Sequence, residues 1–197
     1  ATMSITQTKH DAKLAYRAHL ITRTSEKLDR FFMMRDTLLS IVTNDLSPIY
    51  YKKGANEGGR YYVDEVWYSY PNGRIHIRQR YKNRDGIVTE KTYDSSKCLY
   101  DMMSMLLRAR SFRAEDFRVG EKFQLPMADG HKVEDVTLIY RGREDFQMKS
   151  NGTNYRCLVF SFVEYPDGEE KEIIRFYISD DMNHIPVRLD MYLRFGV

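Results

Sequence analysis

The sequence contains little cysteine and no long apolar run. Its 197 residues include two cysteines, Cys98 and Cys157, which are too few for the disulfide framework of a small secreted scaffold. The residues leave open whether these two thiols pair. No stretch approaches the roughly 18 consecutive apolar residues of a membrane-spanning helix. We therefore expect neither a disulfide-rich fold nor a transmembrane segment in this chain.

The sequence also lacks a strong surplus of either charge. It has 31 basic and 28 acidic residues and a net charge of +3, with no block of like charges that would indicate a binding tail. We therefore expect no nucleic-acid partner.

Sequence motifs of catalysis are missing as well. The chain has no Gly-x-Ser-x-Gly nucleophile elbow and no glycine loop for phosphate. None of its five histidines stands at metal-ligand spacing from a cysteine or another histidine. Asp180, Asp181 and His184 lie close in sequence, but acidic residues also open turns by bonding their own backbone, and that interpretation is favoured. These absences predict a protein that is not an enzyme and has no metal or cofactor.

Asx-Gly pairs are the most informative feature that is present. There are five, each between segments rich in Val, Ile, Tyr and Phe: Asn72-Gly73, Asp85-Gly86, Asp129-Gly130, Asn151-Gly152 and Asp167-Gly168. Glycine adopts positive φ without steric cost, and Asn or Asp tolerates it better than most residues, as tight hairpin turns require. The pairs therefore predict antiparallel β-sheet.

Alternation of apolar and polar residues predicts strands along most of the chain. The predicted strands cover residues 12–23, 35–43, 49–53, 60–70, 74–82, 87–93, 121–126, 132–141, 145–150, 154–164, 171–179 and 186–195. Residues 96–110 instead show helical spacing, with Cys98 on the apolar side and Asp94 or Ser95 as the cap. A second, short helix is predicted from Thr24 or Ser25 to Phe32.

These patterns predict a mostly β protein that forms a single domain over residues 1–197. The expected architecture is a single strongly bent antiparallel sheet or an open, barrel-like β-roll, with one central α-helix packed on its inner face. The chain begins at Ala1 without an initiator Met and ends at Val197 inside a strand-like run. We therefore expect the first strand or strands and the extreme carboxyl end to be missing.

The second half of the chain resembles a known family. The segments that carry the resemblance are residues 117–123, 125–126, 140–144, 155–158 and 177–188. They are similar to the bacterial exported proteins of the domain of unknown function 3108, and residues 29–32, 35–37 and 47–48 fit the same family. The resemblance implies an exported protein, periplasmic or membrane-tethered, in a Gram-negative cell. It implies no activity.

Three residues of the predicted central helix are candidates for ligand contact. Met102, Met103 and Leu106 would line a pliable apolar pocket, because thioethers adapt to irregular ligands. Packing in the core is the other interpretation of the same residues.

A basic strand supplies the remaining candidates. Arg74, Arg78 and Arg80 alternate along residues 74–82 and would meet the anionic part of a ligand. Trp67 would stack on a sugar, and cross-strand aromatic packing is its alternative role. The alternative is a solvated face whose cations pair with acidic residues of neighbouring strands, such as Glu90.

The sequence thus favours a non-catalytic envelope protein that binds an apolar or amphiphilic ligand, such as a lipid, on a concave sheet face. The alternative is a structural or assembly factor that docks another envelope protein without a small-molecule pocket, and a hydrolase is third. A cavity of at least ~300 Å³ beneath the helix would favour ligand binding. A solid core there would favour docking.

Overall fold

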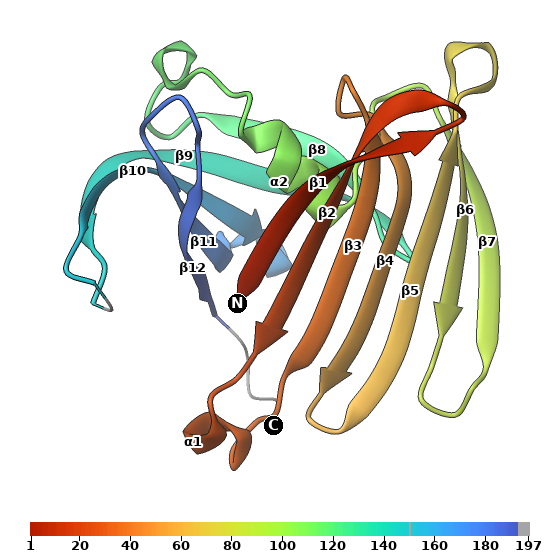
Figure 1. Ribbon diagram of the computed structural model, residues 1–197, viewed down its shortest axis with the longest axis horizontal. Coiled ribbons are helices and arrows are strands. Elements are labelled where there is room, and N and C mark those ends of the chain that lie inside the picture. Colours follow the sequence, from red (N-terminus) through yellow and green to blue (C-terminus); the bar gives the residue numbers. More distant parts are fainter. Residues whose placement is uncertain (150, 193–197) are drawn as a thin grey trace. The chain divides into compact units, whose positions relative to one another are not determined.

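The computed structural model describes residues 1–149 and 151–192. Most of them lie in antiparallel strands, as the alternation predicts, and the strands form two sheets (Figure 1). The chain divides into two compact units: unit 1 comprises Ala1–Arg108 and Pro126–Glu134, and unit 2 comprises Ala109–Leu125 and Asp135–Val197. The prediction of a single sheet is wrong, whereas the prediction of a single domain stays a prediction.

Unit 1 contains a seven-stranded sheet in which each strand pairs with the next along the chain. Its strands are β1 (Thr2–His10), β2 (Lys13–Arg23), β3 (Arg35–Thr43), β4 (Pro48–Glu57), β5 (Arg60–Ser69), β6 (Ile75–Lys82) and β7 (Val88–Ser95). The sequence predicted β3 with its observed limits, but it gave no prediction for β1. Since every connection joins neighbouring strands, short turns suffice for all of them except the β2–β3 connection, which spans residues 24–34.

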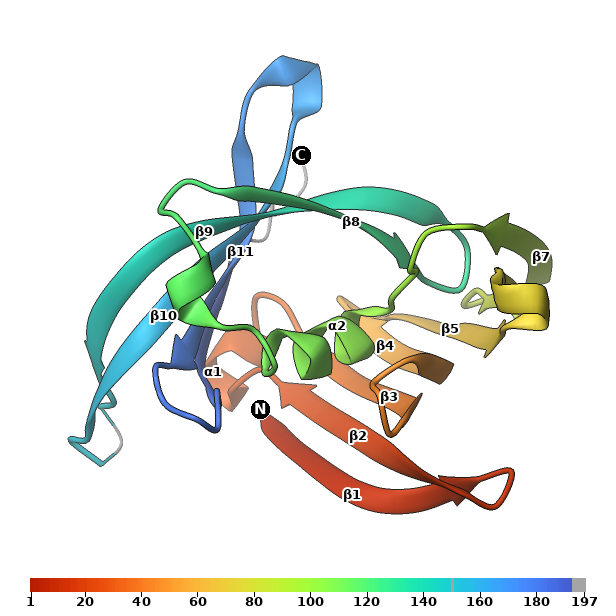
Figure 2. The same cartoon turned by 90° about the horizontal axis from the view of Figure 1, so that it is seen from above.

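Helix α2 (Met102–Ala109) packs on one face of the seven-stranded sheet, which we call the inner face (Figure 2). Met103 and Leu107 of the helix, with Leu99 before it, share a buried cluster with the sheet residues. The sheet residues in this cluster include Ala18, Leu38, Val42, Tyr51, Val66, Tyr68 and Ile77. Burial of these apolar side chains fixes the helix against the sheet.

Helix α2 is shorter than the predicted range 96–110, because β7 continues to Ser95 and the cap lies further along the chain. Asp101 caps the helix: its Oδ1 accepts hydrogen bonds from the backbone N–H of Met103 (2.9 Å) and Ser104 (2.8 Å). Ser104 Oγ accepts in return from the N–H of Asp101 at 2.9 Å, a reciprocal pair that satisfies orphan donors. The predicted caps Asp94 and Ser95 are therefore wrong.

The second sheet has five strands in the order β12-β11-β10-β9-β8 and belongs to unit 2, except that residues 126–128 of β8 and 133–134 of β9 belong to unit 1. Its strands are β8 (Lys122–Ala128), β9 (Val133–Gln147), β10 (Asn154–Glu164), β11 (Lys171–Ser179) and β12 (Pro186–Met191). An aromatic cluster that includes Phe117, Tyr140 and Phe160 packs on this sheet. Residues 193–195 of the predicted last strand lie outside the described residues.

All five Asx-Gly pairs lie in turns between consecutive strands, so this prediction is confirmed. The predicted break between residues 141 and 145 is wrong, because β9 runs through it. The pairing with β10 shifts there, since Val159 opposes Gly142 and Phe160 opposes Tyr140. Gly142 has a φ of 101°, so the glycine allows a β-bulge where the sequence suggested a loop.

The other helices are brief. The predicted helix from Thr24 or Ser25 to Phe32 forms only the single turn α1 (Glu26–Asp29). The remaining helical segments among the described residues are 3₁₀ helices of three residues each: η1 (Pro71–Gly73), η2 (Ala114–Asp116) and η3 (Pro166–Gly168). Within the described residues, neither α1 nor α2 has the length and apolar character that a membrane crossing requires.

Candidate functional site

The helix residues predicted to contact a ligand have different surroundings. Met103 is fully buried in the core between α2 and the sheet, Leu106 is half-buried, and Met102 is 42% exposed. The space beneath the helix is therefore occupied by packed side chains. The core-packing interpretation is correct for Met103.

Arg78, Arg80 and Trp67 lie on the outer face of the same sheet. Ile77 and Gln79 point to the inner face, so their neighbours in β6 point outward. The guanidinium of Arg78 lies 4.2 Å from the centroid of the Trp67 ring. Arg80 pairs with Glu65 at 2.8 Å and with Glu90 at 3.6 Å, as the solvated-face alternative predicted. The structure thus does not bring this basic strand together with Met103.

The structure contains a cavity of about 670 Å³ at one end of the seven-stranded sheet. It is lined by residues near the β1–β2 and β3–β4 turns and at the end of β5: His10, Asp11, Lys13, Leu14, Ala15, Thr43, Asn44, Asp45, Ile49, Tyr68, Ser69 and Tyr70. Apolar and aromatic walls are thus combined with ionisable side chains. None of these lining residues belongs to α2, so the cavity is not the predicted one beneath the helix.

The two cysteines are both free thiols, with Cys98 exposed and Cys157 buried. Cys98 precedes α2 and is exposed, so the prediction that it lies on the apolar side of the helix is wrong. Burial raises the pKa of the Cys157 thiol, so that thiol is a poor nucleophile.

The acidic segment 180–184 forms a turn, the interpretation that the sequence favoured. Asp180 pairs with Arg143 (2.9 Å) and Arg156 (2.6 Å). Asp181 accepts backbone hydrogen bonds from Asn183 and His184.

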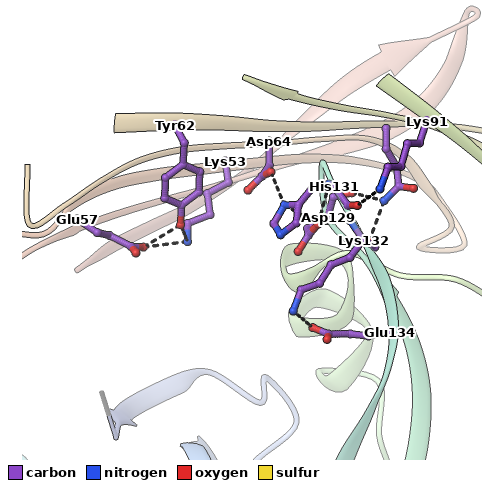
Figure 3. A network of polar contacts seen from close by, with 10 residues as sticks. Lys53, Glu57, Tyr62, Asp64, Lys91, Asp129, His131, Lys132 and Glu134 are labelled. Carbon is purple, nitrogen blue, oxygen red and sulfur yellow. Dashed lines mark hydrogen bonds and ion pairs between the residues drawn. The ribbon is translucent and has the colours of Figure 1, made fainter. Parts of the chain in front are cut away.

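The most developed polar site lies on the inner face, where the segment Pro126–Glu134, here called the tongue, meets β5 and β6 (Figure 3). The buried amide of Gln79 donates hydrogen bonds to the carbonyl oxygens of Asp129 (2.6 Å) and Lys132 (2.8 Å). A Cβ atom at Gly130 would lie only 2.5 Å from the Arg80 carbonyl oxygen and 2.6 Å from Asp64 Cα. Glycine is therefore required for the tongue to approach the sheet this closely.

Two carboxylates and one imidazole converge where the tongue meets β5. Nδ1 of His131 lies 3.1 Å from Oδ1 of Asp64 and 3.1 Å from Oδ1 of Asp129. Asp129 Oδ1 also accepts hydrogen bonds from the backbone N–H groups of His131 and Lys132, both at 2.8 Å. The ring of Tyr81 lies 5.1 Å from the His131 ring. Burial, together with the charge of Asp129, raises the pKa of Asp64 against the opposing effect of His131.

A second polar group lies beside this one on the inner face. Lys53 Nζ lies 2.8 Å from the Tyr62 hydroxyl, 3.0 Å from Glu57 and 3.9 Å from Asp36. Burial raises the pKa of Tyr62 to about 12 and that of Asp36 to about 6. Burial alone would lower the pKa of Lys53, but its contacts with Tyr62 and Glu57 hold it above the ordinary value. The ammonium group is thus held in its charged form.

Asp64, Asp129 and His131 present three ligand atoms within reach of one cation. Sequence reasoning missed them, because Asp64 and His131 are 67 positions apart and show no local spacing. The one available signal was the Asp129-Gly130 pair, which marks the turn but not its partner strand.

Comparison with known proteins identifies a family. The profile described as "Protein of unknown function (DUF3108)" matches residues 1–197, the whole chain, which confirms the resemblance seen in the sequence. A solved structure, described as that of a beta-barrel-like protein of domain of unknown function DUF1849 from Brucella abortus, is similar over 96% of this chain and 87% of its own. Its sequence identity is 11% and the TM-score is 0.49. No curated protein matches.

Proposed function

We propose that this chain, which belongs to the family of proteins of unknown function DUF3108, is an exported, non-catalytic protein of the cell envelope that binds an amphiphilic ligand. The location follows from the exported character of the proteins that its sequence resembles. The cavity at the end of the seven-stranded sheet is the single observation that supports binding.

The cavity has the size and lining of a small-molecule site. Its volume of about 670 Å³ falls within the roughly 300–1,000 Å³ of ligand pockets. Leu14, Tyr68 and Tyr70 supply apolar and aromatic surface for a hydrocarbon part, while His10 and Lys13 supply polar groups for a head group. A ligand with an apolar chain and a polar end matches both parts of the lining.

A fluorescent fatty acid tests this proposal. Leu14 lines the cavity and is 45% exposed, so Leu14→Trp would fill space in the cavity at little cost to folding. Leu189 in β12 is equally exposed at 45% and does not line the cavity, which makes Leu189→Trp the matched control. We expect cis-parinaric acid to bind the wild-type protein and the Leu189→Trp variant alike. The Leu14→Trp variant should bind at least about tenfold more weakly, a loss of about 1.4 kcal/mol.

The proposal is wrong if the unmodified protein does not bind the fatty acid, or if both tryptophan variants bind it as well as wild type does. Native mass spectrometry of the protein purified from its own host then identifies the natural ligand. A co-purifying amphiphile whose amount falls in the Leu14→Trp variant would support the cavity as its site.

A docking or assembly role is the second candidate. Two observations favour it: the core beneath α2 is solid, and β7 is an edge strand whose residues Val88–Asp94 are all exposed. An edge strand offers unpaired backbone groups for another chain to extend the sheet. A photoreactive amino acid at Thr92 should then cross-link one defined envelope protein in intact cells. With the photoreactive residue kept at Thr92, loss of that product on substitution of Glu90 by proline, which cannot donate, would distinguish docking from chance proximity.

A further inference from the structure

We propose that Asp64, Asp129 and His131 form a binding site for a divalent first-row transition-metal ion, with Zn²⁺ as the best match. Each residue offers one ligand atom, and the three atoms lie within 4.8 Å of one another. Asp64 comes from β5, whereas Asp129 and His131 come from the tongue (Figure 3). The site is distinct from the cavity at the sheet end and does not depend on the proposed ligand.

The distances between the ligand atoms suit a chelated ion. Oxygen and nitrogen atoms bound about 2.0–2.2 Å from Zn²⁺ are separated from each other by roughly 2.8–3.6 Å at coordination angles between octahedral and tetrahedral values. Nδ1 of His131 is 3.1 Å from an oxygen of each carboxylate. These two separations suit a chelated ion, and the third, between the two carboxylate oxygens, is at most 4.8 Å.

The same geometry is poorly satisfied by a hydrogen bond alone. A ring nitrogen carries at most one hydrogen, so Nδ1 of His131 cannot make a full hydrogen bond to both carboxylates. The Asp64 side chain is only 4% exposed, so water compensates little for its charge, and the charge of Asp129 adds repulsion. A cation placed among the three atoms interacts favourably with all of them.

The ligand set selects among cations. One imidazole nitrogen with two carboxylate oxygens suits Zn²⁺ or Mn²⁺, whereas Ca²⁺ and Mg²⁺ prefer oxygen ligands throughout. The His131 side chain is 44% exposed and that of Asp129 is 29% exposed, which leaves an entry path and room for water at further coordination positions. The hydrogen bonds that Gln79 donates to the carbonyl oxygens of Asp129 and Lys132 hold the tongue backbone in place. Two of the three ligand residues, Asp129 and His131, are thereby already positioned.

The outer face of the sheet supplies a matched control. His76 Nδ1 lies 3.0 Å from Asp94 Oδ1, a distance similar to that in the proposed site. This pair consists of one histidine and one carboxylate between β6 and β7. We expect it to bind metal weakly, because chelation by three groups is much stronger than binding by two.

The test is titration of the chelator-treated, full-length chain with ZnCl₂ by calorimetry, together with the zinc content after gel filtration. We expect one zinc ion per chain and weak or no binding of CaCl₂. Asp64→Asn and His131→Ala should each weaken zinc binding at least about tenfold, while His76→Ala should leave it unchanged. Circular dichroism and urea unfolding of each metal-free variant will show that it is folded.

Two results would overturn the proposal. One is a wild-type chain that takes up no zinc at millimolar concentration. The other is a zinc affinity that is the same in folded Asp64→Asn and His131→Ala variants as in wild type, or that falls equally in His76→Ala.

Discussion

Replacement of Gly130 by alanine tests whether the tongue is held against the sheet by close backbone packing. The added Cβ would lie 2.5 Å from the Arg80 carbonyl oxygen and 2.6 Å from Asp64 Cα, where about 3.5 Å or more is normal for contacts of this kind. Strands β5 and β6 are paired on both sides and cannot move aside. The tongue must therefore shift by roughly 1 Å.

Two terms contribute to the expected loss of stability. Overpacking of a tight contact costs about 1–3 kcal/mol. Displacement of the tongue also breaks the hydrogen bonds of Gln79, which is 2% exposed, and a buried donor left unpaired costs about 1–3 kcal/mol. We therefore expect the free energy of unfolding to fall by about 2–6 kcal/mol in Gly130→Ala.

Gly54→Ala makes the same chemical change where there is room for it. The nearest atom to a Cβ at Gly54 is the Tyr61 hydroxyl oxygen at 3.7 Å, an ordinary contact. Alanine also reduces the freedom of the unfolded chain, which stabilises a compatible site by about 0.4–1 kcal/mol. Urea unfolding followed by the fluorescence of Trp67, the one tryptophan, measures both variants. Equal midpoints for Gly130→Ala and wild type would refute the reasoning.

Two further predictions concern helix α2. Met103→Ala should lower the free energy of unfolding by about 2–5 kcal/mol because Met103 is fully buried. Met102→Ala, at a side chain that is 42% exposed, should change it by no more than about 0.5 kcal/mol. Equal effects of the two substitutions in urea unfolding would contradict the assigned helix face. Burial raises the pKa of Asp101 from 3.8 to about 6. As the pH rises, the Asp101 carboxyl therefore loses its proton in the unfolded chain before it does so in the folded chain. The folded state loses stability as the pH rises from about 4 to above 6. Asp101→Asn keeps the capping oxygen and lacks this titration, so its stability loss over that pH range should be smaller than that of wild type by about 3 kcal/mol. The same pH dependence in both proteins would show that Asp101 ionises normally.

The sequence predicted local geometry well because local geometry has local causes. Four of the five Asx-Gly pairs mark their turns by a residue at positive φ, and the apolar run at residues 35–43 predicts β3 with its observed limits. Strand β1 was missed because its residues are mostly polar and exposed on both faces. The start of α2 was misplaced because Asp94 and Ser95 also precede it and can act as caps. Only the fold decides that Asp101, buried against Ser40, becomes the cap.

The candidate site was not predictable from sequence in the same way. Alternation places Asp64 on one face of a strand, but it does not say which distant segment covers that face. The approach of the tongue depends on Gln79, which has no distinctive sequence pattern, and on Gly130, whose Asx-Gly pair marks the turn but not the strand that it approaches. Likewise, the division into two sheets depends on long-range pairing, which period-two patterning does not encode.

The tongue has a consequence for how the chain matures during synthesis. The seven-stranded meander is complete once residue 95 has been made, and α2 follows within 14 residues. The segment that completes unit 1 is encoded only at residues 126–134, after the first stretch of unit 2. A chain that folds from its amino end therefore forms the meander with Gln79 and Asp64 still uncovered, and no single cut in the gene yields two fragments that each retain one whole unit.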